Sequence, residues 1–320
     1  MADATPTARA GPGVPYVDAA RLVSLLPPAE ALAAVQHLFA VVGREHVTVP
    51  PRIHLPVPGR HTVGLYMPAA TDRYVGVKIA HLMPRRRPNV EAEIFLYDAE
   101  TGRLLFWGDG KPLTGLRTAA VSAAASLRLQ PTCRRLTVYG AGVQAAAHIA
   151  AFAAAYPMLE EVRAVTRGPE SDARLHDLLA PALRERLLPL GDPARALAEA
   201  DCVVTTTPAP EPVLDWAHLG PRTHVVGIGS ATREMNELPP VAFLEGQVWL
   251  DTANAVKEAG DLHAAVAQGW REERLAGDLF DLLGATTPPP PAPGQRTLFK
   301  SVGHAAQDLA LLIRLWERLQ

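Results

Sequence analysis

Hydrophobic and polar residues alternate in different ways along the chain, and each pattern predicts a different kind of structure. In residues 27–46, apolar side chains recur at the spacing of a helix, at Leu32, Val35, Leu38, Phe39 and Val42. In residues 47–107, short apolar runs such as HTVGLYM, YVGVKIAHLM and AEIFLYD are separated by turn signals. We expect this first part to form a mainly antiparallel β-region behind one helix.

After Thr114 the chain changes to alternating helical and strand-like segments. RTAAVSAAASLRL predicts a helix of small residues, and five strand-like runs follow: LTVYG, VRAVTR, CVVTTT, HVVGIG and QVWLD. Strands separated by helices are typical of a doubly wound parallel sheet. The proline-rich residues 286–294 predict a loop, and residues 302–319 predict a terminal amphipathic helix.

The overall composition is that of a globular enzyme and favours no macromolecular partner. The 320 residues are 48% hydrophobic and 20% charged, enough for about two domains. A formal net charge of -2 predicts no binding to nucleic acid or to an acidic membrane surface. Cys133 and Cys202 predict reduced buried thiols, and the histidines lack metal-site spacing. Residues 1–15 predict a flexible lead-in without a secretory signal, so a cytoplasmic location is expected.

A glycine-rich turn between a predicted strand and a predicted helix is the sharpest local signal. It reads Gly140-Ala141-Gly142-Val143-Gln144, and Ala145 stands where the usual fingerprint has a third glycine. Such a turn lets the backbone approach a pyrophosphate, and the helix N-terminus supplies free N–H groups. The pattern favours a dinucleotide site over an ordinary tight turn.

The tip of the second strand of the alternating region bears on the choice of cofactor. It carries Thr166 and Arg167 and no acidic residue. An acidic side chain at this point binds the ribose hydroxyl of NAD, whereas an arginine accommodates the 2′-phosphate of NADP. The sequence therefore favours NADP(H), with NAD(H) possible and a solvated surface role for Arg167 as the alternative.

Several phrases taken together resemble the ornithine cyclodeaminase/mu-crystallin family. They are VPPR, GVK, LTGLRTAA, GAGVQA, VVTTTP, DTANAVKEAGDL and FKSVGHAAQDLA, which occur in this order over nearly the whole chain. The resemblance implies an α/β fold in which a Rossmann-type doubly wound parallel sheet is inserted into a second α+β domain. Residues 1–118 plus 300–320 are expected to form the domain for substrate binding and dimerisation. Residues 119–299 are expected to form the NAD(P)-binding domain, and the protein is expected to be a homodimer.

The resemblance also implies roles for individual residues. Arg52 and Lys78 match positions that grip a substrate carboxylate, and Arg117 matches one that faces both substrate and cofactor. A buried lysine such as Lys78 would need an anionic partner. Gly303 and His304 fall in the implied substrate site, although a histidine satisfied at a helix start is the simpler explanation of His304. Other implied cofactor contacts are Asn89, Thr118, Val143, Gln144, Thr206, Thr207, Gly227, Ser301 and Val302.

One departure from the family pattern bears on the reaction. Ala231 stands where true cyclodeaminases carry an aspartate, and Arg233 and Met235 replace the family's proline and lysine. Glu234 is a neighbouring carboxylate in an unknown direction. Cyclodeamination needs repeated proton transfer, whereas reduction of a protonated imine needs mainly orientation against the nicotinamide.

The sequence therefore favours an NADPH-dependent reductase of a small imino acid, such as pyrroline- or piperideine-2-carboxylate, or an amino-acid dehydrogenase. An ammonia lyase of the cyclodeaminase type and a non-catalytic binding protein of the crystallin type remain alternatives.

Overall fold

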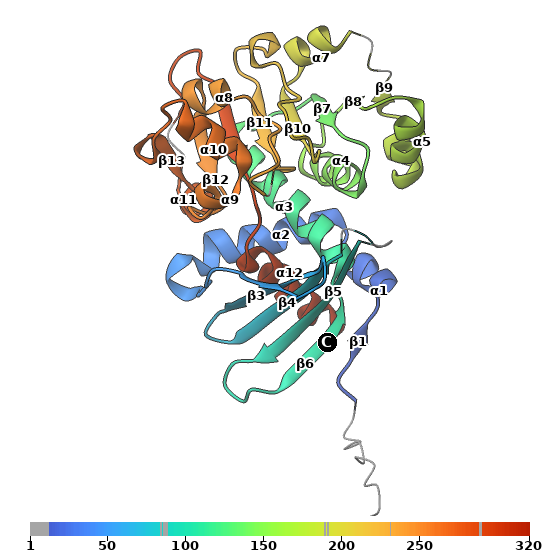
Figure 1. The fold of residues 1–320 in the computed structure, drawn as a ribbon. Helices are drawn as coiled ribbons and strands as arrows, with labels where there is room; N and C mark the ends of the chain where they lie inside the picture. Colours follow the sequence, from blue (N-terminus) through green and yellow to red (C-terminus); the bar gives the residue numbers. More distant parts are fainter. Residues whose placement is uncertain are drawn as a thin grey trace, which may run out of the picture.

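A computed structural model describes residues 13–83, 85, 89–188, 190, 192–230, 232–287 and 290–320. The chain forms two lobes, each built on one sheet, and we call them the lower and the upper lobe as they stand in Figure 1. Most of the predicted lead-in and the informative position Ala231 lie outside the described residues.

The lower lobe contains a six-stranded sheet in the order β1-β6-β5-β4-β3-β2. Its strands are β1 (Tyr16–Val17), β2 (Ile53–Pro56), β3 (Val63–Ala70), β4 (Tyr74–Leu82), β5 (Val90–Asp98) and β6 (Leu104–Asp109). All neighbours are antiparallel except β1 and β6, which run parallel. The mainly antiparallel β-region expected from the alternating apolar runs is confirmed.

Two helices lie between β1 and β2, so the expectation of a single helix was wrong. They are α1 (Ala19–Leu25) and α2 (Pro28–Gln36), and α2 continues through the π-helical turn η1 (His37–Val42) to the 3₁₀ turn η2 (Arg44–His46). The break falls at Pro27-Pro28, because proline disfavours helical backbone in the residue before it. The pair buries Leu22, Leu26, Leu32, Val35 and Leu38.

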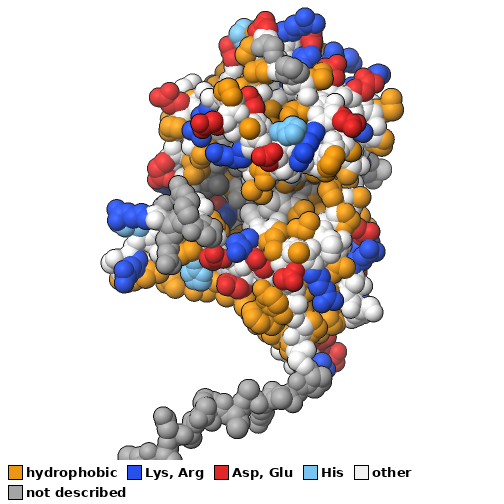
Figure 2. Space-filling view, turned by 90° about the vertical axis from the view of Figure 1, so that its right-hand side faces the viewer, with side chains coloured by type: hydrophobic (Ala, Val, Ile, Leu, Met, Phe, Trp, Pro, Cys, Tyr) orange, Lys and Arg blue, Asp and Glu red, His pale blue; other side chains and the backbone are white. Residues whose placement is uncertain are grey.

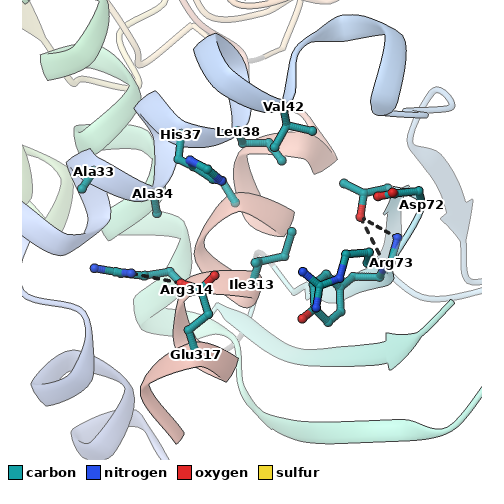
Figure 3. A pocket seen from close by; sticks show the side chains of 13 residues that line it. Ala33, Ala34, His37, Leu38, Val42, Asp72, Arg73, Ile313, Arg314 and Glu317 are labelled. Carbon is teal, nitrogen blue, oxygen red and sulfur yellow. Dashed lines mark hydrogen bonds and ion pairs between the residues drawn. The ribbon is translucent and has the colours of Figure 1, made fainter. Parts of the chain in front are cut away.

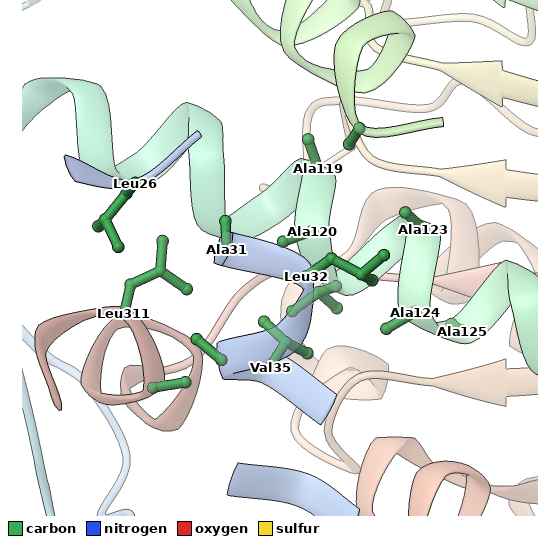
Figure 4. Packing of buried hydrophobic residues seen from close by; sticks show 14 of the residues in the cluster. Leu26, Ala31, Leu32, Val35, Ala119, Ala120, Ala123, Ala124, Ala125 and Leu311 are labelled. Atoms are coloured by element: carbon green, nitrogen blue, oxygen red, sulfur yellow. The ribbon is translucent and has the colours of Figure 1, made fainter. Parts of the chain in front are cut away.

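The helix of small residues, α3 (Lys111–Leu129), runs between the lobes and begins six residues before its predicted start at Arg117. Pro112 lies in its first turn, where the missing N–H of proline costs nothing. Residues Ala119 to Ala125 are buried because α2, α4 and α12 all pack against α3 (Figure 4). Small side chains allow this close approach from several sides.

The upper lobe contains eight parallel strands in the order β13-β12-β14-β11-β10-β7-β8-β9. The five predicted strands are β7 (Arg135–Tyr139), β8 (Glu161–Val165), β10 (Cys202–Thr205), β11 (His224–Gly227) and β12 (Gln247–Leu250). The strands β9 (Leu187–Leu188), β13 (Leu275–Asp278) and β14 (Thr297–Lys300) were not expected. The predicted doubly wound parallel sheet is confirmed, and its strand order reverses between β7 and β10.

Helices connect these strands and cover the sheet. They are α4 (Val143–Ala155), α5 (Pro169–Leu178), α6 (Pro181–Arg184), α7 (Pro193–Glu199), α8 (Pro240–Glu245), α9 (Ala255–Glu258), α10 (Gly260–Ala267) and α11 (Leu279–Gly284), with 3₁₀ turns η3 (Trp216–His218) and η4 (Glu272–Arg274). In the described residues no single helix is long and apolar enough to span a membrane; one pair, α1 with the helix 28–42, meets the length and composition criteria but is bent by 70°.

The chain returns to the lower lobe through its last two elements. Strand β14 lies between β11 and β12 in the upper sheet, whereas α12 (Ala305–Leu319) packs on β3 and β4 of the lower sheet. A Cβ added at Gly76 of β4 would lie only 2.8 Å from Leu309 Cδ1, so glycine permits this close packing. Residues 301–304 cross between the lobes without helical structure, and the terminal helix therefore begins at Ala305 and not at the predicted residue 302. We call residues 301–304 the crossing segment.

Candidate active site

The predicted dinucleotide turn lies at the point where the strand order of the upper sheet reverses. Gly140 follows β7 with φ +119°, and a Cβ at this position would approach Thr206 Oγ1 to 2.6 Å. Thr206 follows β10 and donates to the carbonyl oxygen of Tyr139 through both its backbone N–H and its hydroxyl. Only glycine fits between these two loops, and dinucleotides bind at such a switch point.

The first turn of α4 is open to an anion. Gly142 caps the helix without a side-chain hydrogen bond, and a Cβ built on it meets nothing within 4 Å. Val143 at the first helical position is 65% exposed. The free N–H groups and the positive end of the helix dipole suit the pyrophosphate of NAD(P), so the residues present fit this cofactor.

A pocket of about 270 Å³ extends from this turn towards the lower lobe, and we call it the dinucleotide pocket. Many of the predicted cofactor residues line it together: Arg117, Thr118, Gln144, Thr206, Thr207, Ser301 and Val302. Gly303, predicted to bind substrate, lines it as well. The Oε1 atom of Gln144 is buried without a hydrogen-bond partner among the described residues. This oxygen can accept a hydrogen bond from an N–H or O–H group of a ligand.

Two predicted cofactor residues lie elsewhere. Asn89 is exposed before β5, where its carbonyl oxygen accepts from the N–H of Met83. Gly227 ends β11, and Leu238 Cδ1 would lie 2.6 Å from a Cβ there, so Gly227 faces packed side chains. The two residues after it, Ile228 and Gly229, line the dinucleotide pocket instead.

The residues predicted to decide the cofactor, Thr166 and Arg167, follow the end of β8. Thr166 donates its hydroxyl proton to Asp172 Oδ1 at 2.6 Å, so it has no proton left for a cofactor phosphate. Arg167 is exposed, and the described residues provide no hydrogen bond or ion pair for its guanidinium. Of these two residues, therefore, only Arg167 has side-chain N–H donors free to bind a cofactor phosphate.

Below the dinucleotide pocket, two buried cations share one carboxylate. Lys78 Nζ lies 2.7 Å from Asp308 Oδ1, and Arg117 Nε lies 3.3 Å from the same oxygen. The side chains of Lys78 and Asp308 are each only 2% exposed. Burial lowers the pKa of Lys78 to about 8, against the opposing effect of Asp308, and nearby Arg117 and Arg52 lower it further. The second oxygen of Asp308 is buried without a partner in the described structure.

Arg52 completes the cation cluster from the edge of the lower sheet. Its Nη2 donates to the carbonyl oxygens of Val302 and Gly303, and it lies 2.9 Å from Glu258 Oε2 at the end of α9. Lys78, Arg117 and Arg52 influence one another electrostatically, which places the three predicted catalytic side chains in one group. A carboxylate group is the ligand that such a cluster suits.

Asp251 holds the crossing segment in place. Its Oδ2 accepts hydrogen bonds from the Ser301 hydroxyl at 2.7 Å, from the Val302 and Gly303 backbone amides, and from Gln307 Nε2 at 2.9 Å. Gln307 in turn accepts from Arg117 Nη1. The aspartate of the upper lobe thus fixes the backbone beside the pocket and, through Gln307, one of the cations.

A second buried carboxylate supports the far wall of the dinucleotide pocket. Glu237 is fully buried and accepts from the backbone amides of Thr207 and Gly229 and from the Thr205 hydroxyl. Burial raises its pKa, although Lys300 opposes this shift. The exposed Glu234, by contrast, lies outside the lining of the pocket.

The family model of the ornithine cyclodeaminase/mu-crystallin family matches residues 19–320. The chain belongs to this family. It is similar to a Δ1-pyrroline-2-carboxylate/Δ1-piperideine-2-carboxylate reductase of Azospirillum brasilense, with 34% identity over 310 residues that cover 93% of each protein.

Two solved structures share the fold. A Δ1-pyrroline-2-carboxylate reductase of Thermococcus litoralis in complex with NADH and L-proline has a TM-score of 0.85 at 23% identity, covering 95% of this chain and 96% of its own. The iminosuccinate reductase of Paracoccus denitrificans in complex with NAD+ has a TM-score of 0.85 at 27% identity and covers 95% of both chains.

Several site residues of this family member were missed by sequence reasoning. Asp308, Asp251 and Glu258 all lie inside phrases that carry the family resemblance, FKSVGHAAQDLA and DTANAVKEAGDL. The need of a buried Lys78 for an anion was foreseen, and its partner Asp308 lies four residues after His304 on the terminal helix. Sequence spacing alone does not reveal which of the many carboxylates crosses to another element.

The backbone of Gly303 is predicted to be essential for positioning Arg117. Gly303 has φ +80°, and an added Cβ would approach Arg117 Nη1 to 2.3 Å. We expect Gly303→Ala to displace the guanidinium and to lower kcat/KM about 100-fold, since small misplacements of binding groups have effects of that order. The control is Gly294→Ala, with φ +76° and no neighbour within 4 Å, which isolates backbone strain. Equal losses in both variants would contradict the prediction.

Proposed function

We propose that this protein is an NAD(P)H-dependent reductase of a small imino acid, such as Δ1-pyrroline-2-carboxylate or Δ1-piperideine-2-carboxylate. The observation that carries the proposal is the cluster of Lys78, Arg117 and Arg52 below the dinucleotide pocket. Thr114 connects the two, because it lines the pocket and its hydroxyl accepts a hydrogen bond from Lys78. An imino acid carries a carboxylate for such a cluster and a C=N bond that can accept hydride. The names of the relatives support the same reaction.

The cluster combines three cations with carboxylates. Lys78 and Arg117 share Asp308, and Arg52 pairs with Glu258. Asp251 also acts electrostatically on Arg117. An arginine of the cluster can hold a substrate carboxylate through two parallel charge-assisted bonds.

When bound, the nicotinamide cofactor supplies the hydride for the imine carbon. The chain's part is to orient the imine and to provide a proton for its nitrogen. Lys78 is the group suited to protonating the imine nitrogen. A pKa of about 8 leaves its ammonium largely protonated at neutral pH and makes it a stronger acid than an ordinary lysine. Asp308 holds the ammonium in position, and the packed walls of α3 and α12 exclude water around it.

We also propose a preference for NADP(H). The support is Arg167, an exposed arginine at the tip of β8 where the adenosine ribose of a bound dinucleotide is expected. A guanidinium forks readily onto a phosphate, and no acidic residue occupies the strand tip itself.

A homodimer through the lower sheet is a further part of the proposal. The sheet face opposite α12 carries a row of apolar side chains in register across five strands: Pro68, Val77, Phe95, Trp107 and Tyr16. The Tyr16 and Trp107 rings lie 4.7 Å apart and are 49% and 39% exposed. Figure 2 shows hydrophobic side chains gathered low on the molecule, over the lower lobe. A second copy of this face would bury them.

The first test is cofactor oxidation with Δ1-pyrroline-2-carboxylate and Δ1-piperideine-2-carboxylate, followed across pH. We expect turnover with a kcat/KM that falls above pH about 8, because the Lys78 ammonium is needed and is lost as pH rises through its pKa. Lys78→Met should lower kcat/KM at least 100-fold and remove this limb of the profile. Absence of turnover with either imine would refute the proposal, and ammonia release from ornithine would favour a lyase.

The cofactor preference is tested by Arg167→Ser. Loss of a charge-assisted contact to the 2′-phosphate should lower kcat/KM for NADPH by about 10- to 100-fold and leave the value for NADH unchanged. The matched control is Arg174→Ser, which removes another exposed arginine from α5. A parallel loss with NADH and NADPH would assign Arg167 a structural role.

The oligomeric state is tested by light scattering. We expect a mass twice that of the 34.2 kDa chain, and Trp107→Asp should convert the dimer to monomers by burying a charge in the interface. Val266→Asp is the control, since Val266 is similarly exposed at 38% but lies on α10 of the upper lobe. A monomeric protein without substitutions would overturn this part of the proposal.

A further inference from the structure

The loops at one edge of the upper sheet contribute different parts of the dinucleotide site. The strands β8, β7, β10, β11 and β14 lie side by side and are parallel, so the loops that follow them meet at one edge. Arg167 follows β8 at the proposed adenosine end, the glycine turn follows β7 at the pyrophosphate, and the crossing segment follows β14 beside the cation cluster. The loops after β10 and β11 lie between the last two, where the nicotinamide half of the cofactor is expected.

The loops after β10 and β11 are in direct contact. Thr207 follows β10 and Gly229 follows β11, and both line the dinucleotide pocket. A Cβ added to Gly229 would collide with the carbonyl oxygen of Thr207, so only a glycine allows this approach of the two backbones. Thr206 in turn donates to the carbonyl oxygen of Tyr139 at the end of β7. The shape of this end of the pocket therefore depends on how the two loops are held together.

The carboxylate of Glu237 binds both loops at once. Its Oε1 accepts from the backbone N–H of Thr207, and its Oε2 accepts from the N–H of Gly229 and, at 3.1 Å, from the hydroxyl of Thr205. Both oxygens are thus committed to residues of the two loops. An ionised carboxylate has only acceptor sites, so it can satisfy these three donors together, whereas an amide of the same shape would present an N–H to one of them.

The charges around Glu237 compensate only in part for the cost of burying it. Burial raises the pKa of Glu237, nearby Lys300 lowers it, and nearby Asp261 raises it further. Lys300 Nζ lies 3.3 Å from Asp261 Oδ2, and Asp261 Oδ1 accepts from the backbone N–H of Glu237 at 2.7 Å. An apolar side chain would fill the same space at lower cost, so we attribute the carboxylate to the loop donors that it satisfies.

We propose that Glu237 is a positioning residue for the nicotinamide half of the cofactor, because its carboxylate fixes the loops after β10 and β11 that form this end of the pocket. This inference rests on the proposed function. Glu237 is fully buried, so it acts through the backbone of Thr207 and Gly229 and touches no ligand itself. Protonation at Oε2 would reverse the hydrogen bond with Thr205 and leave Gly229 a weaker acceptor, so the loops need the ionised form.

The test measures the dissociation constant of NADPH from alkaline to acid pH by the fluorescence of its nicotinamide. We expect Glu237→Gln to raise this constant about tenfold, because one loop donor then faces an N–H group in place of an oxygen. In the unchanged protein the constant should rise towards acid pH, since the carboxylate is lost as pH falls through its raised pKa, and Glu237→Gln should lack this rise. The 2′-phosphate of NADPH titrates with both proteins, so the two are compared at each pH.

Turnover separates a positioning role from a loss of folded protein. Glu237→Gln should raise KM for NADPH by about the same factor and leave KM for the imine, measured at saturating NADPH, within about twofold. A smaller fraction of folded protein would lower the apparent kcat and change neither KM.

Two controls make the same chemical change elsewhere. Asp201→Asn alters a carboxylate that accepts from the backbone N–H groups of Arg134 and Arg135, where β7 and β10 begin at the opposite edge of the same sheet. Glu317→Gln alters a carboxylate in a separate groove of the lower lobe, between η1, α12 and the β3–β4 turn (Figure 3). Neither residue lines the dinucleotide pocket, so both variants should keep the dissociation constant of the unchanged protein and its dependence on pH.

The outcomes separate the failure of this inference from that of the proposed function. A Glu237→Gln protein that binds NADPH as tightly as the unchanged protein, or that keeps the rise at acid pH, would overturn the inference alone. An equal loss of affinity in Asp201→Asn would also overturn it. If Glu237→Gln does not fold, Glu237→Asp replaces it: the shorter carboxylate cannot reach both loops, so NADPH should bind more weakly, and unchanged affinity would count against the inference. An unchanged protein that binds neither NADPH nor NADH would refute the proposed function, and this inference with it.

Discussion

The site depends on placing cations in a buried position where a substrate carboxylate binds. A buried ammonium or guanidinium without an anion is costly, and here Asp308 meets that need for both Lys78 and Arg117. Asp308 stands on α12, which packs on the sheet that carries Lys78. The apolar packing of the lower lobe therefore fixes the distances between these charges. The carboxylate of Asp308 offsets the repulsion between Lys78 and Arg117.

The same chain segment connects this cluster with the cofactor pocket. Residues 301–304 run from the upper sheet to α12, and Asp251 binds their backbone and Gln307. Arg52 of the lower lobe binds the carbonyl oxygens of the same segment, and Arg117 binds Gln307. Groups from both lobes thus bind one stretch of backbone, so hydrogen bonds to residues 301–304 set the relative position of the dinucleotide pocket and the cation cluster.

The fold could largely be read from the sequence, and the reasons are local. The strands β7, β8, β10, β11 and β12 are apolar runs between helical segments, which is a strong pattern. The short strand β14 was missed because it follows a proline-rich loop and pairs only with strands distant in sequence. The helix α1 was missed, whereas the predicted start of the next helix at residue 27 lies within one residue of the start of α2.

For the site, the glycine turn and the three cations were identified, whereas their anionic partners were not. Gly140 has a local signature because its backbone conformation excludes other residues. Asp308 and Glu258 have none, since each pairs with a cation more than 200 positions away and looks like any surface acid in the sequence. The same is true of Asp251, whose hydrogen-bond partners lie 50 to 56 positions away. Ion pairs of this kind depend on the packing of α12 and α9, which no sequence window contains.

The proton-carrying groups around the pocket bear on the choice between reduction and cyclodeamination. Among the described residues that line the dinucleotide pocket there is no aspartate, glutamate or histidine. The nearby Lys78 has a pKa of about 8 and donates to Asp308 and Thr114, and the sequence places alanine at 231. Cyclodeamination needs a base for several successive proton transfers, whereas reduction of an imine needs one proton and one hydride. A proton donor such as Lys78 beside a carboxylate clamp is chemically matched to the shorter reaction.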